Sequence, residues 1–421
     1  MSNFKSSNNQ QNQPSPFAAL QFPEFRSYVI ARFFLILVIN MQATLVSWKV
    51  YDITKDPFSI GLIGLVEFIP AFAMAFYAGH VIDKSDKRNL LLFSTIGNLL
   101  LMIVVTFITS GYAIKNFQTD NILIVIFVVI FTIGILRAFT GPTSFALLSH
   151  LVPAEHLPNA ITWNSGSWQV AAVSGPALAG ILYGSIGITH TFYLMLLLIC
   201  IAVAGTIAIG KKPVLSWDRE ESILTSIRKG FRFVWKSKEV LGAMSLDLFA
   251  VFFGGATALL PYFADVILKV GPQGLGMLRS APALGSVVVL MAVAIKPLKK
   301  NQGKIMLICA GGFGVCIMLF GLSNLFWLSM LSLFLSGILD GVSVIVRSTI
   351  LQLKTPSDMK GRVASLNSIF VMSSNELGSF ESGFTAKLMG VIPAVLFGGS
   401  MTVIVAITTW IKAPTLRKME Y

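Results

Sequence analysis

The chain has 421 residues, of which 55% are hydrophobic and only 12% are charged. Because soluble domains carry about 25% charged residues, this composition excludes an ordinary soluble protein and indicates a polytopic membrane protein. The formal net charge of +13 would suggest a nucleic-acid partner in a soluble protein. Here the cations lie between apolar segments, so membrane topology explains the charge better.

Twelve apolar segments follow a polar N-terminal stretch. Met1 to Pro16 are amide-rich and without periodicity, so we expect residues 1–20 to form a disordered cytoplasmic tail. Each later segment is long enough to cross the hydrocarbon core of a bilayer. The segments cover residues 26–50, 60–82, 89–110, 121–150, 159–187, 190–210, 241–268, 273–296, 304–322, 325–353, 362–388 and 392–412. The predicted fold class is an all-α membrane protein with twelve transmembrane helices.

The distribution of Lys and Arg predicts that both termini are cytoplasmic. If the N-terminus lies inside, the basic residues of the first charged turn, the long middle loop and the C-terminal tail all fall on the cytoplasmic side. The opposite side then receives only five, Lys49, Lys55, Lys115, Lys269 and Lys387. Because cytoplasmic loops carry the excess of Lys and Arg, we expect a multi-pass protein of the bacterial inner membrane with both ends inside.

A long loop divides the chain into two sets of six segments. We expect six-helix bundles over residues 21–210 and 241–413, a cytoplasmic linker over 211–240 and a cytoplasmic tail over 414–421. Within the linker, apolar residues recur at helical spacing between basic ones: Ile223, Ile227, Phe231, Val234 and Trp235. This pattern predicts a basic amphipathic helix on the inner membrane surface. The alternative is a plain basic linker that only sets topology.

The two sets of segments repeat one another. The stretch from Gly134 to Arg137 matches the stretch from Gly337 to Asp340 at an offset of 203 residues. The same offset relates Asn164 to Asn367. A parallel repeat of six helices is an architecture of transporters whose substrate lies between the halves at the middle of the membrane.

The turn between the second and third segments carries a motif made of Gly79, Asp83, Lys84, Lys87 and Arg88. The pattern Gly-x-x-x-Asp-(Arg/Lys)-x-x-(Arg/Lys)-(Arg/Lys) resembles the loop between helices two and three of the major facilitator superfamily. It departs from the usual family pattern in having Lys84 for Arg and Asp86 for Gly. An ordinary basic turn is the alternative explanation of this motif taken alone.

Two further stretches carry the resemblance. Gly175, Pro176 and Gly180 resemble the glycine-proline signature of exporter branches of the superfamily. Gly361 and Arg362 belong to a loop that resembles the branch of the macrolide and enterobactin exporters. The resemblance implies the major facilitator fold, with two six-helix pseudo-repeats, and gating roles for these residues and for the first turn motif.

Charged residues within the apolar segments are the candidates for function, because a buried ion is costly in a membrane. Glu67 should lie well inside the second helix, where neighbouring groups decide whether its carboxyl is charged. Arg137 and Gly141 resemble the superfamily's helix-four pattern, whose arginine is linked to proton transfer in proton-coupled members. The candidates for proton coupling are Glu67, Arg137, Asp340 and Glu376, and those for the substrate cavity are Arg32, Asn40, Gln42, Asp247, Arg279 and Arg347. The alternative for Glu67 is a purely structural ion pair with a buried arginine.

The sequence contains no Walker loop and no nucleophile–base arrangement, and Cys200, Cys309 and Cys316 lack metal-ligand spacing. We therefore expect a transporter and not an enzyme, without a cofactor, driven by a proton or sodium gradient. The expected function is proton-coupled export of a small amphipathic or anionic compound, of the drug or siderophore type, by alternating access. Proton-coupled uptake is one alternative, and a non-transporting receptor or scaffold with the same fold is another. The expected partners are membrane lipids and a small-molecule substrate, with no nucleic acid, and the protein is expected to be a monomer.

Overall fold

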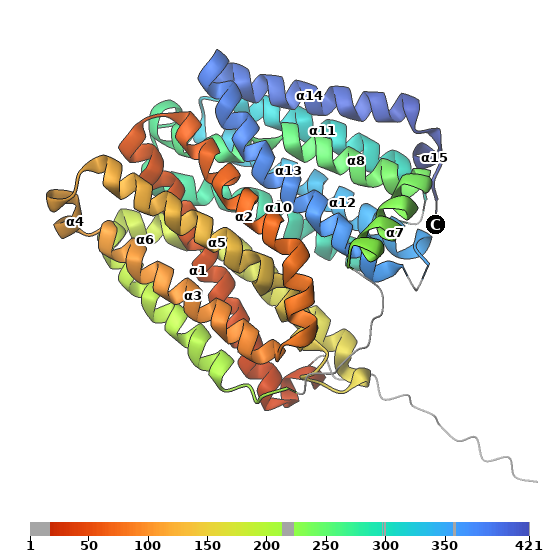
Figure 1. Cartoon of the computed structure of the whole chain (residues 1–421). Helices are drawn as coiled ribbons and strands as arrows, with labels where there is room; N and C mark the ends of the chain where they lie inside the picture. Colours follow the sequence, from red (N-terminus) through yellow and green to blue (C-terminus); the bar gives the residue numbers. More distant parts are fainter. Residues whose placement is uncertain (1–16, 213–222, 297, 299, 357–358, 421) are drawn as a thin grey trace, which may run out of the picture.

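A computed structural model describes residues 17–212, 223–296, 298, 300–356 and 359–420, and these form helices with no strand among them (Figure 1). The first half contains α1 (Pro23–Thr54), α2 (Pro57–Lys84), α3 (Lys87–Ile108), the short α4 (Gly111–Asn116), α5 (Thr119–Leu148) and α6 (Leu157–Ile207). The second half contains α8 (Lys238–Phe253), α9 (Leu260–Tyr262), α10 (Gly271–Ile295), α11 (Gln302–Leu322), α12 (Phe326–Lys354), α13 (Lys360–Met389) and α14 (Val391–Lys412). Between the halves lies α7 (Ile223–Lys236), and α15 (Pro414–Arg417) follows α14. The prediction of an all-α membrane protein is confirmed.

The long helix α6 turns back on itself at Gly187, whose φ of +81° favours glycine. Asn164, before this point, accepts a hydrogen bond of 3.2 Å from the Tyr28 hydroxyl. Gly205, after it, packs on Ala31, one turn further along α1. Residues 41 positions apart in α6 therefore contact neighbouring turns of α1. The chain can do this only if it reverses at Gly187, close to the predicted boundary between the fifth and sixth segments.

Ten helices of the described residues are long and apolar enough to cross a membrane. The span that contains α6 is counted as one of the ten, although the chain reverses within it and two predicted segments fall there. The 30-residue helix α13 is not among them, because Asn375, Glu376 and Glu381 interrupt its apolar sequence. These two features separate the ten spans from the twelve segments expected, and the exact number of crossings stays a prediction.

The segment predicted at 241–268 is not one continuous helix. It consists of α8, the 3-10 helix η3 (Gly255–Leu259), α9 and the π-helical turn η4 (Phe263–Ile267). At Gly255 a side-chain carbon would lie 2.6 Å from the carbonyl carbon of Gly378 in α13, so only glycine allows this approach. Pro261, further along, has no N–H to donate to a helical hydrogen bond. The break places η3 beside α13, at the boundary between the halves.

Both expected tails are shorter than predicted. Met1 to Pro16 lie outside the described residues, but Ala18–Gln21 form a 3-10 helix, and the Ala19 N–H donates a 2.9 Å hydrogen bond to Asn159 Oδ1. At the other end α15 follows α14 directly, and Leu416 is fully buried among apolar residues of the second half. The expectation of disorder was therefore wrong for residues 17–20, and residues 414–419, expected only to form a cytoplasmic tail, pack against the second bundle.

The two halves meet along two helix pairs, α2 with α13 and α6 with α10. Figure 1 shows the first half at the lower left and the second half at the upper right, with α2 and α13 side by side between them. We call the end that holds Lys212 and α7 the linker end, and the end that holds the α1–α2 turn at Lys55 the far end.

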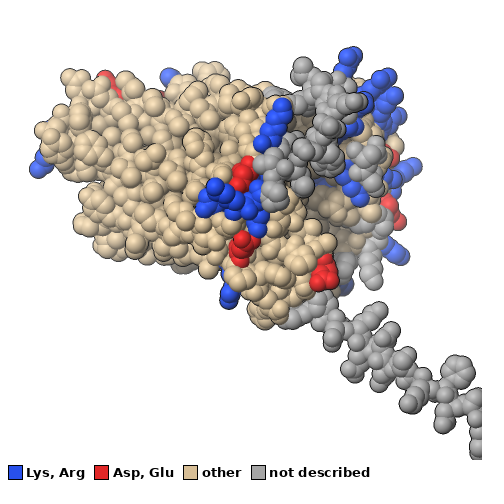
Figure 2. Space-filling model, turned by 60° about the horizontal axis from the view of Figure 1, so that its bottom comes forward, with Lys and Arg blue, Asp and Glu red and all other residues tan. Residues whose placement is uncertain are grey.

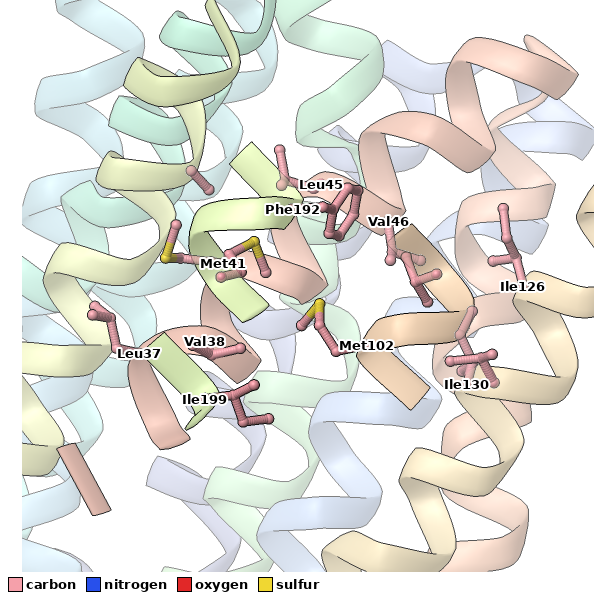
Figure 3. Close-up of a cluster of buried hydrophobic side chains, with 14 of the residues drawn as sticks. Leu37, Val38, Met41, Leu45, Val46, Met102, Ile126, Ile130, Phe192 and Ile199 are labelled. Atoms are coloured by element: carbon pink, nitrogen blue, oxygen red, sulfur yellow. The ribbon is translucent and has the colours of Figure 1, made fainter. Parts of the chain in front are cut away.

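The core of the first half fixes α1 against α3 and α6. Val38 and Met41 of α1, Met102 of α3, and Phe192 and Ile199 of α6 are fully buried in one cluster (Figure 3). Helix packing of this kind in a membrane depends on close van der Waals contact, because lipid chains are as apolar as the core. The cluster holds α1 in place, and α1 carries several residues of the site described below.

The molecular surface is mostly apolar. Large side chains such as Phe93 and Phe145 are 68% and 70% exposed, as expected of helices that face lipid. On the face shown in Figure 2, Lys and Arg gather toward one end, and most of the remaining face is uncharged. This surface belongs to a multi-pass integral membrane protein.

Candidate substrate cavity and ion-pair site

A cavity lies between the two halves and encloses about 950 Å³ of space, its open mouth included. Side chains of α1, α2, α3 and α5 line it from the first half, and side chains of η3, α10 and α13 line it from the second. Most of the lining is aliphatic: Ile39, Val46, Ile60, Ile63, Val105, Ile126, Val129, Ile130 and Ile133. The polar lining is small: Gln42, Ser47, Glu67, Arg279, Glu376 and Ser379. An apolar pocket with a few convergent polar groups is the usual form of a small-molecule site.

One guanidinium joins the halves beside this cavity. Arg137 Nη1 of α5 lies 2.6 Å from Glu67 Oε1 of α2 and 2.5 Å from Glu376 Oε1 of α13. The Glu67 and Glu376 side chains are 20% and 15% exposed, whereas Arg137 is 46% exposed. Glu67 and Arg137 come from the first half and Glu376 from the second, so an ion pair crosses the boundary that a transporter must open. Three of the four residues proposed for proton coupling therefore meet at one point.

Close helix packing explains how these side chains meet. At Gly134, one turn before Arg137, a side-chain carbon would lie 2.8 Å from the ring of Pro70 in α2. At Gly64 it would lie 2.9 Å from Ser379 Cβ in α13. Small residues at these crossings let the backbones approach, so the acidic and basic side chains reach one another.

A second arginine also crosses between the halves, but without a carboxylate partner. Arg279 Nη1 of α10 donates hydrogen bonds to Ser47 Oγ (2.9 Å) and to the Ala43 carbonyl oxygen (3.2 Å), both on α1. Among the described residues, no carboxylate oxygen lies within 4 Å of its charged nitrogens. Arg279 thus lines the cavity, with its charge held by neutral acceptors.

The fourth proton-coupling candidate, Asp340, lies elsewhere. It lines a crevice only about large enough for one water molecule inside the second half, together with Asp247 and Ser343. Asp247 of α8 forms a buried ion pair with Arg347 of α12. Expecting Asp247 and Arg347 at the substrate cavity was therefore wrong, because they pair with each other inside one bundle.

Two further cavity candidates also lie away from it. Asn40 donates a hydrogen bond of 2.9 Å to the Ile36 carbonyl oxygen of its own helix, and its Cβ faces Gly175 of α6. Arg32 lies one turn after Tyr28 in α1, outside the cavity lining. Of the polar residues proposed on α1, only Gln42 lines the cavity.

The glycine-proline motif of α6 forms a contact between the halves. A side-chain carbon at Gly180 would lie 2.8 Å from the Cα of Gly276 in α10, and Gly276 in turn approaches the Pro176 carbonyl. Gly61 and Gly383 face each other in the same way between α2 and α13. By contrast, nothing lies within 4 Å of side-chain carbons built at Gly79 or Gly361, toward the linker end. The halves are closely packed at the far end.

An ion pair also joins the halves at the far end. Lys55 Nζ lies 3.1 Å from Asp52 Oδ1 in its own half and 3.4 Å from Asp265 Oδ2 in the other. The pair is exposed, so it is worth at most about 1 kcal/mol. It adds to the backbone contacts that close this end.

The turn motif after α2 fastens the start of α3 to the end of α6 at the linker end. Asp86 accepts a 2.9 Å hydrogen bond from the Arg88 N–H and so caps the start of α3. The Arg88 guanidinium donates to the carbonyl oxygens of Ile209 and Ile207 at the end of α6, at 2.9 Å each.

The other charged residues of this motif and of the second loop motif are placed as follows. Lys84 is exposed, and the side chain of Asp83 lies outside the described part of the structure. Lys87 is buried, and Arg362 of the other motif donates to Met359 Sδ at 3.3 Å.

Sequence reasoning missed Ser47 and Ser379. Ser47 binds Arg279 across the boundary, and Ser379 lies one turn after Glu376 in the cavity wall. A small hydroxyl in an apolar segment gives almost no signal in a sequence, because many such residues bond only to their own helix, as Thr44 does to the Asn40 carbonyl.

Two helical halves around a charged cavity within an apolar, multi-pass bundle define a membrane transporter. The fold is that of major facilitator transporters. A D-xylose-proton symporter superposes with a TM-score of 0.70 at 11% identity, covering 94% of this chain and 99% of that chain. The nucleoside transporter NupG superposes with a TM-score of 0.69 at 16% identity, covering 94% and 100%.

Sequence relatives place the chain within that superfamily. A family model described as transmembrane secretion effector matches residues 14–421, and the chain belongs to this family. The enterobactin exporter EntS of Escherichia coli O1:K1 is 24% identical over 407 residues, which cover 94% of each chain. EntS of Citrobacter koseri is 23% identical over the same length and coverage. The predicted resemblance to the enterobactin-exporter branch is confirmed, and these relatives are transporters and not enzymes.

Proposed function

We propose that the protein is a proton-coupled exporter of a small amphipathic or anionic compound, of the drug or siderophore type. It works by alternating access in the bacterial inner membrane, with both termini cytoplasmic. The observation that carries the proposal is the single guanidinium of Arg137 shared by Glu67 of one half and Glu376 of the other. Export is supported by the relatives, which are named as exporters of enterobactin.

Because Glu67 and Glu376 share one guanidinium, protonation of either carboxylate changes how the two halves are held together. A carboxylate that takes up a proton loses its charge, and its ion pair with Arg137 becomes an ordinary hydrogen bond or breaks. If the proton binds Glu376, the link between the halves weakens while Arg137 stays paired with Glu67. When this proton is taken up from outside, while the far end is open, the carrier can close the far end and return to the arrangement described here, in which Gly79 and Gly361 have open space around them at the linker end.

The aliphatic wall and the charged groups have separate roles. The isoleucine and valine side chains remove the apolar body of the substrate from water. Gln42, Ser47 and Arg279 supply the polar contacts that orient it. Release of the proton on the cytoplasmic side then restores both ion pairs, and the carrier makes its outward passage with substrate and without the proton. The energy comes from an ion gradient, with the proton as the proposed coupling ion in place of sodium.

The test is flux through the purified protein in proteoliposomes, with enterobactin and the macrolide erythromycin as probes. A pH gradient of either sign is imposed with and without sodium, and probe movement and internal pH are followed together. We expect probe to move against the proton current, with no need for sodium. Probe that moves with the protons would favour uptake. Binding of a probe without flux under any gradient would favour a receptor or scaffold.

A further inference from the structure

The helix α7 in the central loop has one face fixed to the second half. Val234 is 3% exposed and packs with Val240 and Met306 of that half. On the same side, a side-chain carbon at Gly230 would lie 3.2 Å from Arg362 Cβ and from Leu366 Cδ1 of α13. This face therefore lies against the linker end of the helix that carries Glu376.

The opposite face of α7 is exposed and carries two parallel rows of side chains. Phe231 and Trp235, one turn apart, are 47% and 66% exposed, and their rings stack with centroids 5.9 Å apart. Arg228, Arg232 and Lys236 form the neighbouring row and are exposed as well. Within the described chain, no carboxylate oxygen lies within 4 Å of these three cations.

The position of α7 brings this face next to the bilayer. Only Ser237 separates α7 from α8, whose apolar residues enter the membrane span that begins at Lys238. An aromatic pair beside a row of cations, one residue from a membrane span, matches an interfacial helix whose rings lie at the boundary between headgroups and acyl chains. A nucleic acid or an acidic protein would satisfy the cations but would leave the two rings in water.

We propose that α7 docks on anionic lipid headgroups of the adjacent leaflet, with Phe231 and Trp235 inserted at the headgroup boundary and Arg228, Arg232 and Lys236 on the phosphates. Each cation near an anionic surface raises the affinity by about fivefold. Through Gly230 and Val234, the docked helix holds the linker end of α13. The docking goes beyond the proposed function and does not depend on it.

The test is quenching of Trp235 by brominated lipids in nanodiscs that contain the full chain. The chain has seven tryptophans, so the Trp235 emission is obtained as the difference between the wild type and Trp235→Phe. Nanodiscs are prepared with brominated phosphatidylglycerol or with brominated phosphatidylcholine at equal mole fraction. We expect the Trp235 emission to be quenched several-fold more by the anionic brominated lipid.

A charge variant tests the role of the cations. The triple variant Arg228→Gln/Arg232→Gln/Lys236→Gln should lose the preference for phosphatidylglycerol, whereas Arg228→Lys/Arg232→Lys should keep it. The matched control Lys300→Gln/Lys304→Gln, which removes two exposed cations just before and within the first turn of α11, should leave the quenching unchanged.

Two results would overturn the proposal. Equal quenching by both lipids would show that the cations do not select headgroups. Quenching of Trp235 by aqueous iodide but by neither lipid would place this face in the cytosol, where a soluble partner would then be its occupant. Neither result bears on proton-driven flux, which is measured separately.

Discussion

Replacement of Glu67 by glutamine tests the shared guanidinium most directly. Glu67→Gln keeps the shape of the side chain and removes the charge that pairs with Arg137 at 2.6 Å. The Arg137 side chain is 46% exposed, so water screens part of the interaction. The interaction free energy lost on removing the Glu67 charge therefore falls between two limits. It is up to about 1 kcal/mol for an exposed ion pair and about 3–5 kcal/mol for a buried one. A value of about 2 kcal/mol corresponds to roughly a 30-fold change in an equilibrium constant.

A loss of this size should uncouple probe transport from the proton gradient without unfolding the protein. In proteoliposomes, Glu67→Gln should bind probe and exchange it down its own gradient within about threefold of the wild type, since the aliphatic wall is intact. Accumulation of probe against its gradient, driven by protons, should fall by roughly 30-fold. Both fluxes are measured with the same labelled probe, with and without a pH gradient.

The matched control is Glu381→Gln. Glu381 lies on the same helix as Glu376 but does not line the cavity, so its replacement should leave both fluxes unchanged. If Glu67→Gln retains proton-driven accumulation while Glu376→Gln loses it, the proton site is on Glu376 alone. If neither change affects accumulation, the reasoning from the shared guanidinium is wrong.

Three further outcomes are expected. Gly276→Leu should force the two halves apart at the far end, because a side-chain carbon at residue 276 would lie 2.8 Å from the Gly180 Cα. Spin labels on the two halves should then report a longer distance. An unchanged distance would contradict the close packing inferred for this end. Arg88→Gln removes two 2.9 Å hydrogen bonds to the end of α6 and should lower the free energy of unfolding by about 1–2 kcal/mol. This should appear as a lower unfolding temperature in detergent. An unchanged unfolding temperature would show that the turn motif only sets topology. Cysteines at Ser85 and Thr119 should react with impermeant reagents from the cytoplasm and from outside, respectively, and the reverse pattern would invert the proposed orientation.

The sequence predicts the membrane segments well because length and apolarity suffice for them. Gly187 is the last residue of the fifth predicted segment and is the point of reversal, even though the helix is otherwise continuous. The interruption between α8 and η4 was not predicted, although Gly254, Gly255 and Pro261 are helix breakers within the segment. It depends on the approach of Gly378 in α13 to Gly255, which is a contact between residues far apart in the chain.

The site is partly predictable for a similar reason. The sequence points to Glu67, Arg137 and Glu376 because an ionised side chain within a membrane segment carries a large free-energy cost and is therefore usually functional. This free-energy cost does not indicate which charged residues line the same cavity. Asp247 and Arg347 satisfy the same criterion, yet they pair with each other inside one bundle. Separating the two groups requires the packing of α2 on α13, which no single helix encodes.

The charges around the cavity have a consequence for the response to membrane voltage. Glu67 and Glu376 are balanced by Arg137 and Arg279, so the four groups carry no net charge when both carboxyls are ionised. Uptake of one proton gives the site a charge of +1. A charge that crosses the membrane field exchanges about 2.3 kcal/mol per 100 mV with it. With a neutral substrate, the electrical potential would therefore drive only the proton-loaded passage of the cycle, and the substrate-loaded passage would proceed at a rate independent of voltage.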